Sequence, residues 1–379
     1  MPFASALSEH PLTATAVGEV AGQVLERLGA RPDLVMLFLT PPHGGALEDA
    51  AAAVRSILDP TVLLGCAAVA VAGAGREVEH DPAVSLWAGS FGEVASVRLG
   101  ARPGSLGPEI TGWPDELPFE PTALILLADP YSFPVDALFE LVEQRHPGLP
   151  VIGGMASAAR GPGGNRLAID GSVVTSGAVG VLIGPGVLLT TVVSQGCRPI
   201  GTPLVVTRAE GNLMHELAGE PPLHRLIQQA QDLPPGDIAL INQGLQLGVV
   251  IDEHKLEFER GDFLIRNVMG ADRETGTMQV GDQIEVGTTV QFQVRDAQSA
   301  DEDLRELLLG RRADGALLFT CNGRGTNLFP VPDHDAEVIS DMLGPVPVAG
   351  FFAAGELGPV GPRNFLHAFT ASVALFRDP

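Results

Sequence analysis

The sequence predicts a mixed α/β fold, bordering on α+β, in which mixed sheets carry flanking helices. Three observations predict this class: apolar runs of strand length, a helical pattern after several of them, and the return of this order along the chain. Runs that are apolar at every position must be covered on both faces. A helix between two such strands typically makes the crossover that a parallel pair requires. We therefore expect parallel pairs within sheets that also contain antiparallel strands.

The first predicted unit begins with a buried strand at Leu34–Thr40 and continues with an alanine-rich helix at Ala46–Leu58. Apolar residues recur in this helix at the spacing of a segment that covers a sheet with one face. A second apolar strand, Val62–Leu64, then runs into the small-residue segment Gly65–Ala68. The order strand, helix, strand and small-residue loop defines the unit.

Two later segments repeat this order. In the second, strand Ala123–Ala128 and helix Val135–Arg145 lead to an apolar strand that ends at Gly153. In the third, strand Ala316–Thr320 and a helix from about Asp335 to Leu343 lead to a strand that ends at Gly350. Each unit is expected to continue into a hairpin, so the chain is built from repeated strand-helix-strand-hairpin units.

Four runs between and after the first units alternate more strongly and are predicted as antiparallel strands. They cover Ser172–Ile183, Val187–Ser194, Thr277–Gln279 and Thr289–Arg295. The polar stretch Glu210–Gln231 favours a helix. The apolar run 177–193 is broken by a Gly-Pro-Gly turn, which favours two buried strands over a membrane span.

The length of 379 residues predicts two or three domains. The segment Gly196–Pro203 is rich in Gly and Pro and is the best candidate boundary. We therefore expect an N-terminal extension at residues 1–32, a first domain at 33–198 and a related second domain at 199–379.

Composition excludes several classes of function. A formal net charge of -23 repels phosphate backbones and anionic lipid headgroups, so we expect neither nucleic-acid nor membrane binding. The three cysteines form no CxxC pair and the histidines no HxxxH pair, so no metal or other cofactor is expected. The N-terminus lacks the pattern of a signal peptide, and a cytoplasmic location is the expectation.

The most informative candidate site follows the first strand of the third unit. That strand ends in a loop formed by Cys321, Asn322, Gly323, Arg324 and Gly325. The glycines permit close backbone approach, and successive amide groups in such a turn can bind an anion. The Arg324 guanidinium would add a fork for a carboxylate. Two interpretations stay open: the loop binds an anionic ligand, or Arg324 pairs with a neighbouring Asp or Glu.

Two further segments supply candidate ligand-binding residues. Glu356 follows a buried strand within small residues, where its carboxylate can hold a ligand amine or cap a neighbouring segment. Asn364 and His367 lie on one predicted strand, but three positions apart they point to opposite faces. A buried structural histidine is therefore the alternative for His367.

Weaker candidates lie elsewhere. Arg266 and Asn267 interrupt an apolar strand, and a buried Arg266 needs a partner, either Asp296, Asp272 or a ligand anion. Gly153 and Gly154 offer backbone donors but lack the spacing of a dinucleotide-binding loop.

A catalytic alternative assigns Cys321 as a nucleophile. His367 or His334 would serve as the base, with Asp333 or Asp335 as the group that orients it. Because the members of such a triad meet in space and not in sequence, no spacing identifies it.

Several motifs resemble the FIST family. Five segments resemble the C-terminal FIST domain: Asp314–Gly325, Gly350–Glu356, Asn364–Thr370, Gly261–Gly270 and Gly287–Asp296. The N-terminal FIST domain is similar to the segments around Gly65–Ala68 and Gly153–Ser157, and the match spans roughly Asp33 to Phe376.

This resemblance implies a sensory module that binds small ligands such as amino acids. The chain carries no kinase, cyclase, F-box or methyl-accepting segment, so we expect the signal to pass through a separate protein partner. In the leading hypothesis, Arg324 anchors the ligand carboxylate and Glu356 the amine. The alternatives are a thiol-dependent hydrolase or transferase that uses Cys321 and His367, and a protein-interaction module without a ligand.

Overall fold

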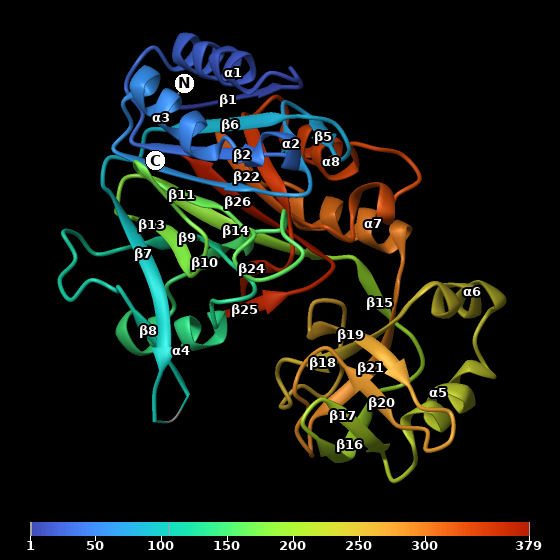
Figure 1. Cartoon of the computed structure of the whole chain (residues 1–379). Coiled ribbons are helices and arrows are strands. Elements are labelled where there is room, and N and C mark those ends of the chain that lie inside the picture. Colours follow the sequence, from blue (N-terminus) through green and yellow to red (C-terminus); the bar gives the residue numbers. More distant parts are fainter. Residues whose placement is uncertain (1, 106, 379) are drawn as a thin grey trace. The chain divides into compact units, whose positions relative to one another are not determined.

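The computed structural model describes residues 2–105 and 107–378 and divides them into two compact units (Figure 1). Unit 1 contains the described residues up to Val193, together with Leu304–Leu366 and those from Thr370 onward. Unit 2 contains Ser194–Asp303 and His367–Phe369. The domain limits 33–198 and 199–379 stay a prediction. The two compact units instead meet along the chain near Ser194 and near Leu304.

Unit 1 contains three mixed sheets. The first has the order β1 (Phe3–Ser8), β6 (Val84–Gly89), β2 (Leu34–Leu39), β3 (Val62–Ala67), β11 (Leu167–Ile169), β12 (Ser172–Val174). The second has the order β25 (Arg363–His367), β24 (Glu356–Val360), β10 (Val151–Met155), β9 (Ala123–Ala128), β13 (Ala178–Ile183), β7 (Val94–Pro103), β8 (Pro108–Thr111). The third has the order β14 (Leu188–Gln195), β26 (Thr370–Arg377), β22 (Gly315–Cys321), β23 (Val348–Ala353), β4 (Val71–Gly73), β5 (Arg76–Val78).

Each sheet is centred on the parallel pair that one repeat supplies. These pairs are β2 with β3, β9 with β10, and β22 with β23. The crossover in each pair contains a helix: α3 (Leu47–Leu58), α4 (Val135–Arg145) or α8 (His334–Leu343). The predicted parallel pairing and the mixed α/β class are confirmed. All three repeats lie in unit 1.

The hairpin that follows each repeat does not complete its own sheet. Hairpin β4–β5 follows the first repeat but pairs with β23 of the third. Strand β24, which follows the third repeat, pairs with β10 of the second. Hairpin β11–β12, which follows the second repeat, pairs with β3 of the first. The three repeats therefore exchange hairpins in a closed cycle.

The strands on the opposite side of each sheet follow the same rule. Strand β7 leaves the first repeat and pairs with β13 of the second sheet, and β14 leaves the second repeat and lies beside β26 of the third. The N-terminal strand β1 occupies the equivalent place beside β6 in the first sheet. Each repeat thus provides strands for the sheet of another repeat. The first sheet receives its strand on this side from the N-terminal segment, as β1.

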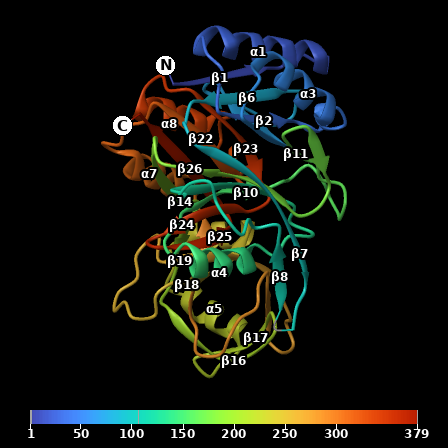
Figure 2. The same cartoon turned by 90° about the vertical axis from the view of Figure 1, so that its left-hand side faces the viewer.

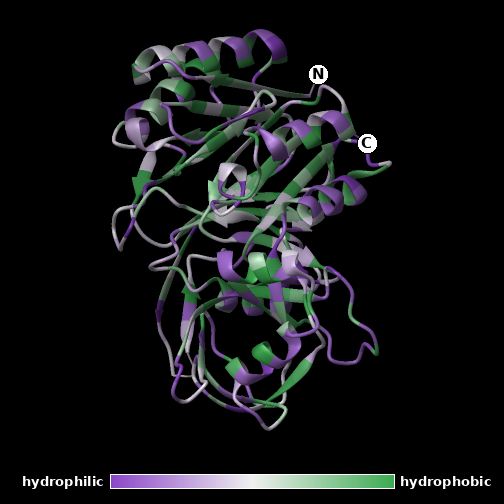
Figure 3. Cartoon of the chain, turned by 90° about the vertical axis from the view of Figure 1, so that its right-hand side faces the viewer, coloured by the Kyte–Doolittle hydropathy of each residue, from purple (hydrophilic) through white to green (hydrophobic). Residues whose placement is uncertain are grey.

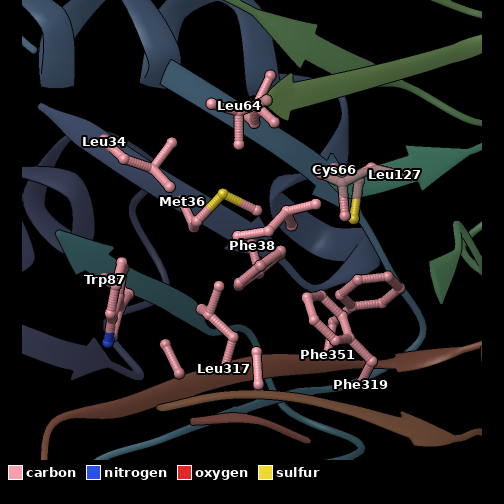
Figure 4. Packing of buried hydrophobic residues seen from close by; sticks show 14 of the residues in the cluster. Leu34, Met36, Phe38, Leu64, Cys66, Trp87, Leu127, Leu317, Phe319 and Phe351 are labelled. Atoms are coloured by element: carbon pink, nitrogen blue, oxygen red, sulfur yellow. The ribbon is translucent and has the colours of Figure 1, made fainter. Parts of the chain in front are cut away.

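The inner faces of the three sheets form one apolar core. Phe38 from the first sheet packs on Phe351 from the third, with ring centroids 5.2 Å apart (Figure 4). The ring centroids of Trp87 in β6 and Phe376 in β26 are 5.1 Å apart, and the Trp87 indole N–H donates to the Pro347 carbonyl. Each fully buried large side chain of this kind contributes about 1.5–3 kcal/mol.

Helices cover the outer faces. α1 (Thr13–Leu28) and α3 pack on the first sheet (Figure 2), and α4 packs on the second. α8 and the end of α7 (Ala297–Leu308) pack on the third. Figure 3 shows the consequence for hydropathy, because the strands of unit 1 are largely green and the helices combine green with purple.

Unit 2 is an antiparallel barrel. Its strands are β15 (Cys197–Pro199), β16 (Leu204–Glu210), β17 (Leu213–Leu217), β18 (Leu245–Val250), β19 (Phe263–Ala271), β20 (Met278–Val280) and β21 (Thr289–Arg295). Because β21 pairs with both β16 and β18, the run β21-β16-β17-β20-β19-β18 closes on itself, and β15 adds to β21. Its apolar interior contains Val206, Met214 and Phe292.

Two local predictions are wrong. The stretch Glu210–Gln231 is not helical throughout, because Leu213–Leu217 forms β17 in a hairpin with β16. Helix begins only at α5 (Pro222–Ala230), where proline suits the first turn, and α6 (Pro235–Gln243) follows. The run Ser172–Ile183 pairs antiparallel as predicted but forms two strands and not one, because Gly177 at φ +80° separates β12 from β13.

The run 177–193 forms β13 and most of β14, with a turn between them, and the two strands lie in different sheets. Within residues 2–105 and 107–378, no helix has the length and apolarity needed to cross a membrane.

Gly350→Ala should destabilise unit 1 strongly. A Cβ at this position would lie 1.8 Å from the Leu318 carbonyl oxygen, so β22 and β23 would have to separate. We expect a loss of at least about 2 kcal/mol, measured by chemical unfolding. Fluorescence reports on unit 1 alone, because both tryptophans, Trp87 and Trp113, lie there.

The matched control for this prediction is Gly18→Ala on the exposed side of α1, where nothing lies within 4 Å of the added Cβ. Alanine favours the helix there, so unit 1 should gain up to about 1 kcal/mol. Equal effects of the two substitutions would contradict the close approach of β22 and β23.

Candidate functional site

Five polar side chains of unit 1 gather where β22 and β23 end. We call Glu77, Cys321, Arg324, Asp335 and Glu356 the polar cluster. None of them is more than 6% exposed. Buried groups of this polarity require partners, so their contacts determine what the site can do.

Arg324 and Asp335 form a buried two-point ion pair. Arg324 Nε donates to Asp335 Oδ2 at 2.8 Å, and Nη2 donates to Oδ1 at 2.7 Å, with both side chains essentially inaccessible. Asp335 therefore occupies the guanidinium fork in which the sequence predicted a ligand carboxylate. The other interpretation, an ion pair with a neighbouring acid, is what the structure shows.

The ion pair keeps both groups charged. Burial would raise the pKa of Asp335, but Arg324, with hydrogen bonds from His334 and Thr320, holds the pKa of that carboxyl well below its usual value. Burial would lower the pKa of Arg324, and the adjacent Asp335 reverses this and raises it. The Arg324 guanidinium also lies 5.2 Å from the centre of the Phe329 ring.

Glu77 reaches the cluster on the exchanged hairpin β4–β5. Its Oε1 accepts a hydrogen bond from the backbone N–H of Ala336 at 3.0 Å, at the start of α8. Its own N–H donates to Asp333 Oδ1 at 2.6 Å. Burial raises the pKa of Glu77 well above its usual value, and the negative charge of Asp335 raises it further.

Glu356 begins β24 and lies opposite Gly154 of β10. Its Oε2 accepts hydrogen bonds from the N–H and the hydroxyl of Thr370 at 3.1 and 2.9 Å. Burial raises the pKa of Glu356 to about 8, against the hydrogen bonds of Thr370 and Cys321 and the charge of Arg324. The group is therefore mostly a neutral acid at pH 7.

Cys321 ends β22 at the edge of the cluster. Its thiol accepts a hydrogen bond from the Gly323 backbone N–H at 3.4 Å, and the side chain keeps 6% exposure. An interaction between Cys321 and Glu356 contributes to the pKa of the acid.

The loop 322–333 carries Arg324 into the cluster. Its other side faces solvent, where Asn322, Thr326 and Asn327 are exposed. Glu79 of unit 1 holds it by accepting hydrogen bonds from the Thr326 N–H at 2.9 Å and the hydroxyl at 2.8 Å. At Gly325 the backbone turns at φ +54°, and a Cβ there would lie 2.7 Å from Glu79 Oε1.

Three buried atoms of the cluster have no hydrogen-bond partner among the described residues. They are Arg324 Nη1, Glu77 Oε2 and Glu356 Oε1. An unsatisfied buried polar group costs about 1–3 kcal/mol, and more when it is charged. One donor and two carboxyl oxygens of the cluster thus have hydrogen-bonding capacity that the described residues do not use.

Some predicted site residues have other roles in unit 1. Asn364 Nδ2 donates to the Leu149 carbonyl at 2.9 Å, and Oδ1 accepts from the Val151 N–H at 2.8 Å, so the amide fastens β25 to the start of β10. Gly153 allows close packing, because a Cβ there would lie 1.9 Å from the Leu126 carbonyl oxygen. Asn322, Gly323 and Gly325 belong to the loop that adjoins the cluster.

Three predicted site residues, Arg266, Asn267 and His367, belong to unit 2. Arg266 Nε donates to Asp282 Oδ2 at 2.6 Å, so the guanidinium pairs with an acid that the sequence analysis had not named. Asp296 instead pairs with Arg198 at 2.5 Å. These residues are not members of the polar cluster.

Sequence reasoning missed Glu77 and Thr370 as site residues and considered Asp335 only as a helix-opening or orienting acid. The alternation in Arg76-Glu77-Val78-Glu79 indicates a strand, but nothing in it indicates a partner 259 residues away. Among residues 2–105 and 107–378, no group of three or more His, Cys, Asp or Glu side chains is placed to hold a metal ion.

Comparison with known proteins agrees with the motifs. Residues 33–220 match the FIST N domain model, and residues 224–359 match the FIST C domain model. The chain is 47% identical over 371 residues to the uncharacterized protein Mb0898c of Mycobacterium bovis, covering 95% of each. It is 46% identical over 383 residues to the uncharacterized protein Rv0628c of Mycobacterium tuberculosis, covering 98% of each.

Asp335→Asn should destabilise unit 1 by about 3–5 kcal/mol, because it leaves the Arg324 charge buried without its counter-ion. The measurement is urea unfolding followed by tryptophan fluorescence. The control is Glu109→Gln, which removes one charge from the exposed Arg102–Glu109 pair and should change stability by less than about 1 kcal/mol. Similar losses in both variants would contradict the importance of burial.

Glu356→Gln should change how stability depends on pH. The folded state holds a proton on Glu356 up to about pH 8, whereas the unfolded chain releases it near 4.5. The stability contributed by this proton is full below pH 4.5 and is lost as the pH rises toward 8, by up to about 1.4 kcal/mol per unit. Glutamine resembles the neutral acid and should remove this slope.

The measurement is the unfolding midpoint of the wild type and of Glu356→Gln at several values from pH 5 to about 9. This range includes the Glu356 pKa of about 8. The difference between them should grow in favour of Glu356→Gln as the pH rises. Parallel curves would show that Glu356 is ionised in the folded state.

Proposed function

The chain belongs to the FIST family, and on this premise we propose that it is a sensory protein that binds a small polar ligand at the polar cluster and signals through a separate protein partner. The observation that carries the proposal is the set of buried atoms without partners, Arg324 Nη1, Glu77 Oε2 and Glu356 Oε1. They come from segments far apart in the sequence, so the fold has to bring them together before a ligand can be held.

The chemistry of these atoms limits the ligand. Arg324 Nη1 needs an acceptor. Each of the two carboxyl groups accepts hydrogen bonds when ionised and can also donate its O–H when neutral. A compact molecule with an acceptor and an amine or amide satisfies all three. Amino acids and small amides are of this class. With Asp335 in the guanidinium fork, a ligand acceptor would receive one Arg324 N–H bond and not two.

Transmission follows from the loop 322–333. Because Arg324 and Phe329 face inward while Asn322, Thr326 and Asn327 are exposed, a ligand that enters must displace this segment. The Glu79 and Glu77 contacts tie the same segment to the hairpin β4–β5. Ligand binding would therefore change a surface that a partner can recognise, provided that the ligand binds the two loop arrangements with different affinity.

Isothermal titration calorimetry of the full chain with amino acids, small organic acids and small amides tests the proposal. At least one compound should give a saturable heat, and Glu356→Gln should weaken its binding about tenfold or more, the effect of losing one buried hydrogen bond of about 1.4 kcal/mol. The matched control is Glu26→Gln, at an exposed position of α1, which should bind as the wild type does.

A panel without any saturable heat would contradict ligand binding and favour the alternative of a protein-interaction module. Equal affinities of Glu356→Gln and wild type would place the ligand elsewhere than at the polar cluster.

A further inference from the structure

The three cysteines occupy different surroundings. Cys66 lies in the apolar core of unit 1, where burial raises the pKa of its thiol. Cys197 is fully buried with Val250, Phe263 and Ile265 in unit 2. Cys321 retains 6% exposure and adjoins charged groups. Reactivity of a cysteine depends on its thiolate and on access, so these surroundings predict unequal chemistry.

Two features near Cys321 stabilise negative charge on sulfur. The Gly323 backbone N–H donates to Sγ at 3.4 Å. The Arg324 guanidinium is close enough for Cys321 to contribute to the upward shift of the Arg324 pKa. A permanent cation and a backbone donor are the surroundings in which a thiolate becomes a nucleophile.

The same place contains groups that suit a peroxide. Arg324 Nη1 and Glu356 Oε1 are buried and without partners among the described residues. A hydroperoxide presents two adjacent oxygens, so one can accept the Arg324 N–H while the other receives a proton from the carboxyl group of Glu356. Both side chains are fully buried, and both interact with Cys321.

We propose that Cys321 is an oxidation site at which a hydroperoxide converts the thiolate to a sulfenic acid, with Glu356 as the proton donor. The Cys321 proton is first released to solvent. Sulfur then attacks the nearer peroxide oxygen, an S–O bond forms and the O–O bond breaks. Sulfur is oxidised by two electrons and the peroxide is reduced. The departing oxide takes the Glu356 proton and leaves as water or an alcohol.

This chemistry goes beyond the proposed ligand sensing and does not depend on it. A sulfenic oxygen needs room at the end of β22. Oxidation should therefore shift the loop 322–333, which begins at the next residue.

The test is brief exposure of the full chain to a small excess of hydrogen peroxide with dimedone present, followed by peptide mass spectrometry. Dimedone should label Cys321 and leave Cys66 and Cys197 unlabelled, which makes them internal controls. The rate of dimedone labelling at Cys321 should fall tenfold or more in Glu356→Gln and remain unchanged in Glu26→Gln. Cys321→Ser should show no labelling at this position.

A second comparison needs no substitution. At the same pH, Cys321 in the folded wild type should react at least tenfold faster than Cys321 in the urea-unfolded chain. A slower or equal rate in the folded protein would overturn the proposal, as would labelling of Cys66 at the same rate. An unchanged rate in a folded Glu356→Gln would overturn the assignment of the proton donor. These labelling outcomes do not depend on whether calorimetry detects a ligand, so the two proposals can fail separately.

Discussion

The cyclic exchange of edge strands is the constraint on which unit 1 depends. Every parallel pair is bordered by strands from outside its own repeat, from β4 on β23 to β11 on β3 and β24 on β10. Without these neighbours, the strands at the edge of each parallel pair would have backbone N–H and carbonyl groups without hydrogen-bond partners. No repeat can satisfy its own sheet, so the repeats form one body. The N-terminal strand β1 closes the first sheet, just as β7 and β14 border the other two.

The exchange also explains how the polar cluster is assembled. β5 brings Glu77 from the first repeat to the third sheet, and β22 supplies Cys321. β24 brings Glu356 to the second sheet, opposite Gly154. A buried ion pair contributes little net stability after desolvation, and three unpartnered atoms are a further cost. Retaining such groups in an otherwise apolar core is reasonable if they act on something that enters the site.

Local pattern was enough to predict much of this molecule. The strand at Ala123–Ala128 and the helix at Val135–Arg145 occur as expected, because short-range periodicity determines them. It also drew attention to Arg324 and Glu356, since charges beside glycine and alanine at strand ends are unusual. The partner of Arg324 was not determined, because Asp335 competes with any ligand for the same fork. Hairpin exchange escaped prediction altogether, since pairing between strands far apart leaves no local pattern.

Protonation of Glu356 connects the separate roles of the cluster. Asp335 occupies the fork of Arg324, and the charge of Arg324 offsets only part of the effect of burial on Glu356, so burial keeps Glu356 protonated up to about pH 8. That proton makes the acid compatible with the core, and in the two proposals it is the proton offered to a ligand or to a departing oxide. After each transfer, the carboxylate left behind is unstable where it lies. At pH 7, below the pKa of the group, Glu356 recovers a proton from solvent, so the acid itself is restored after each transfer.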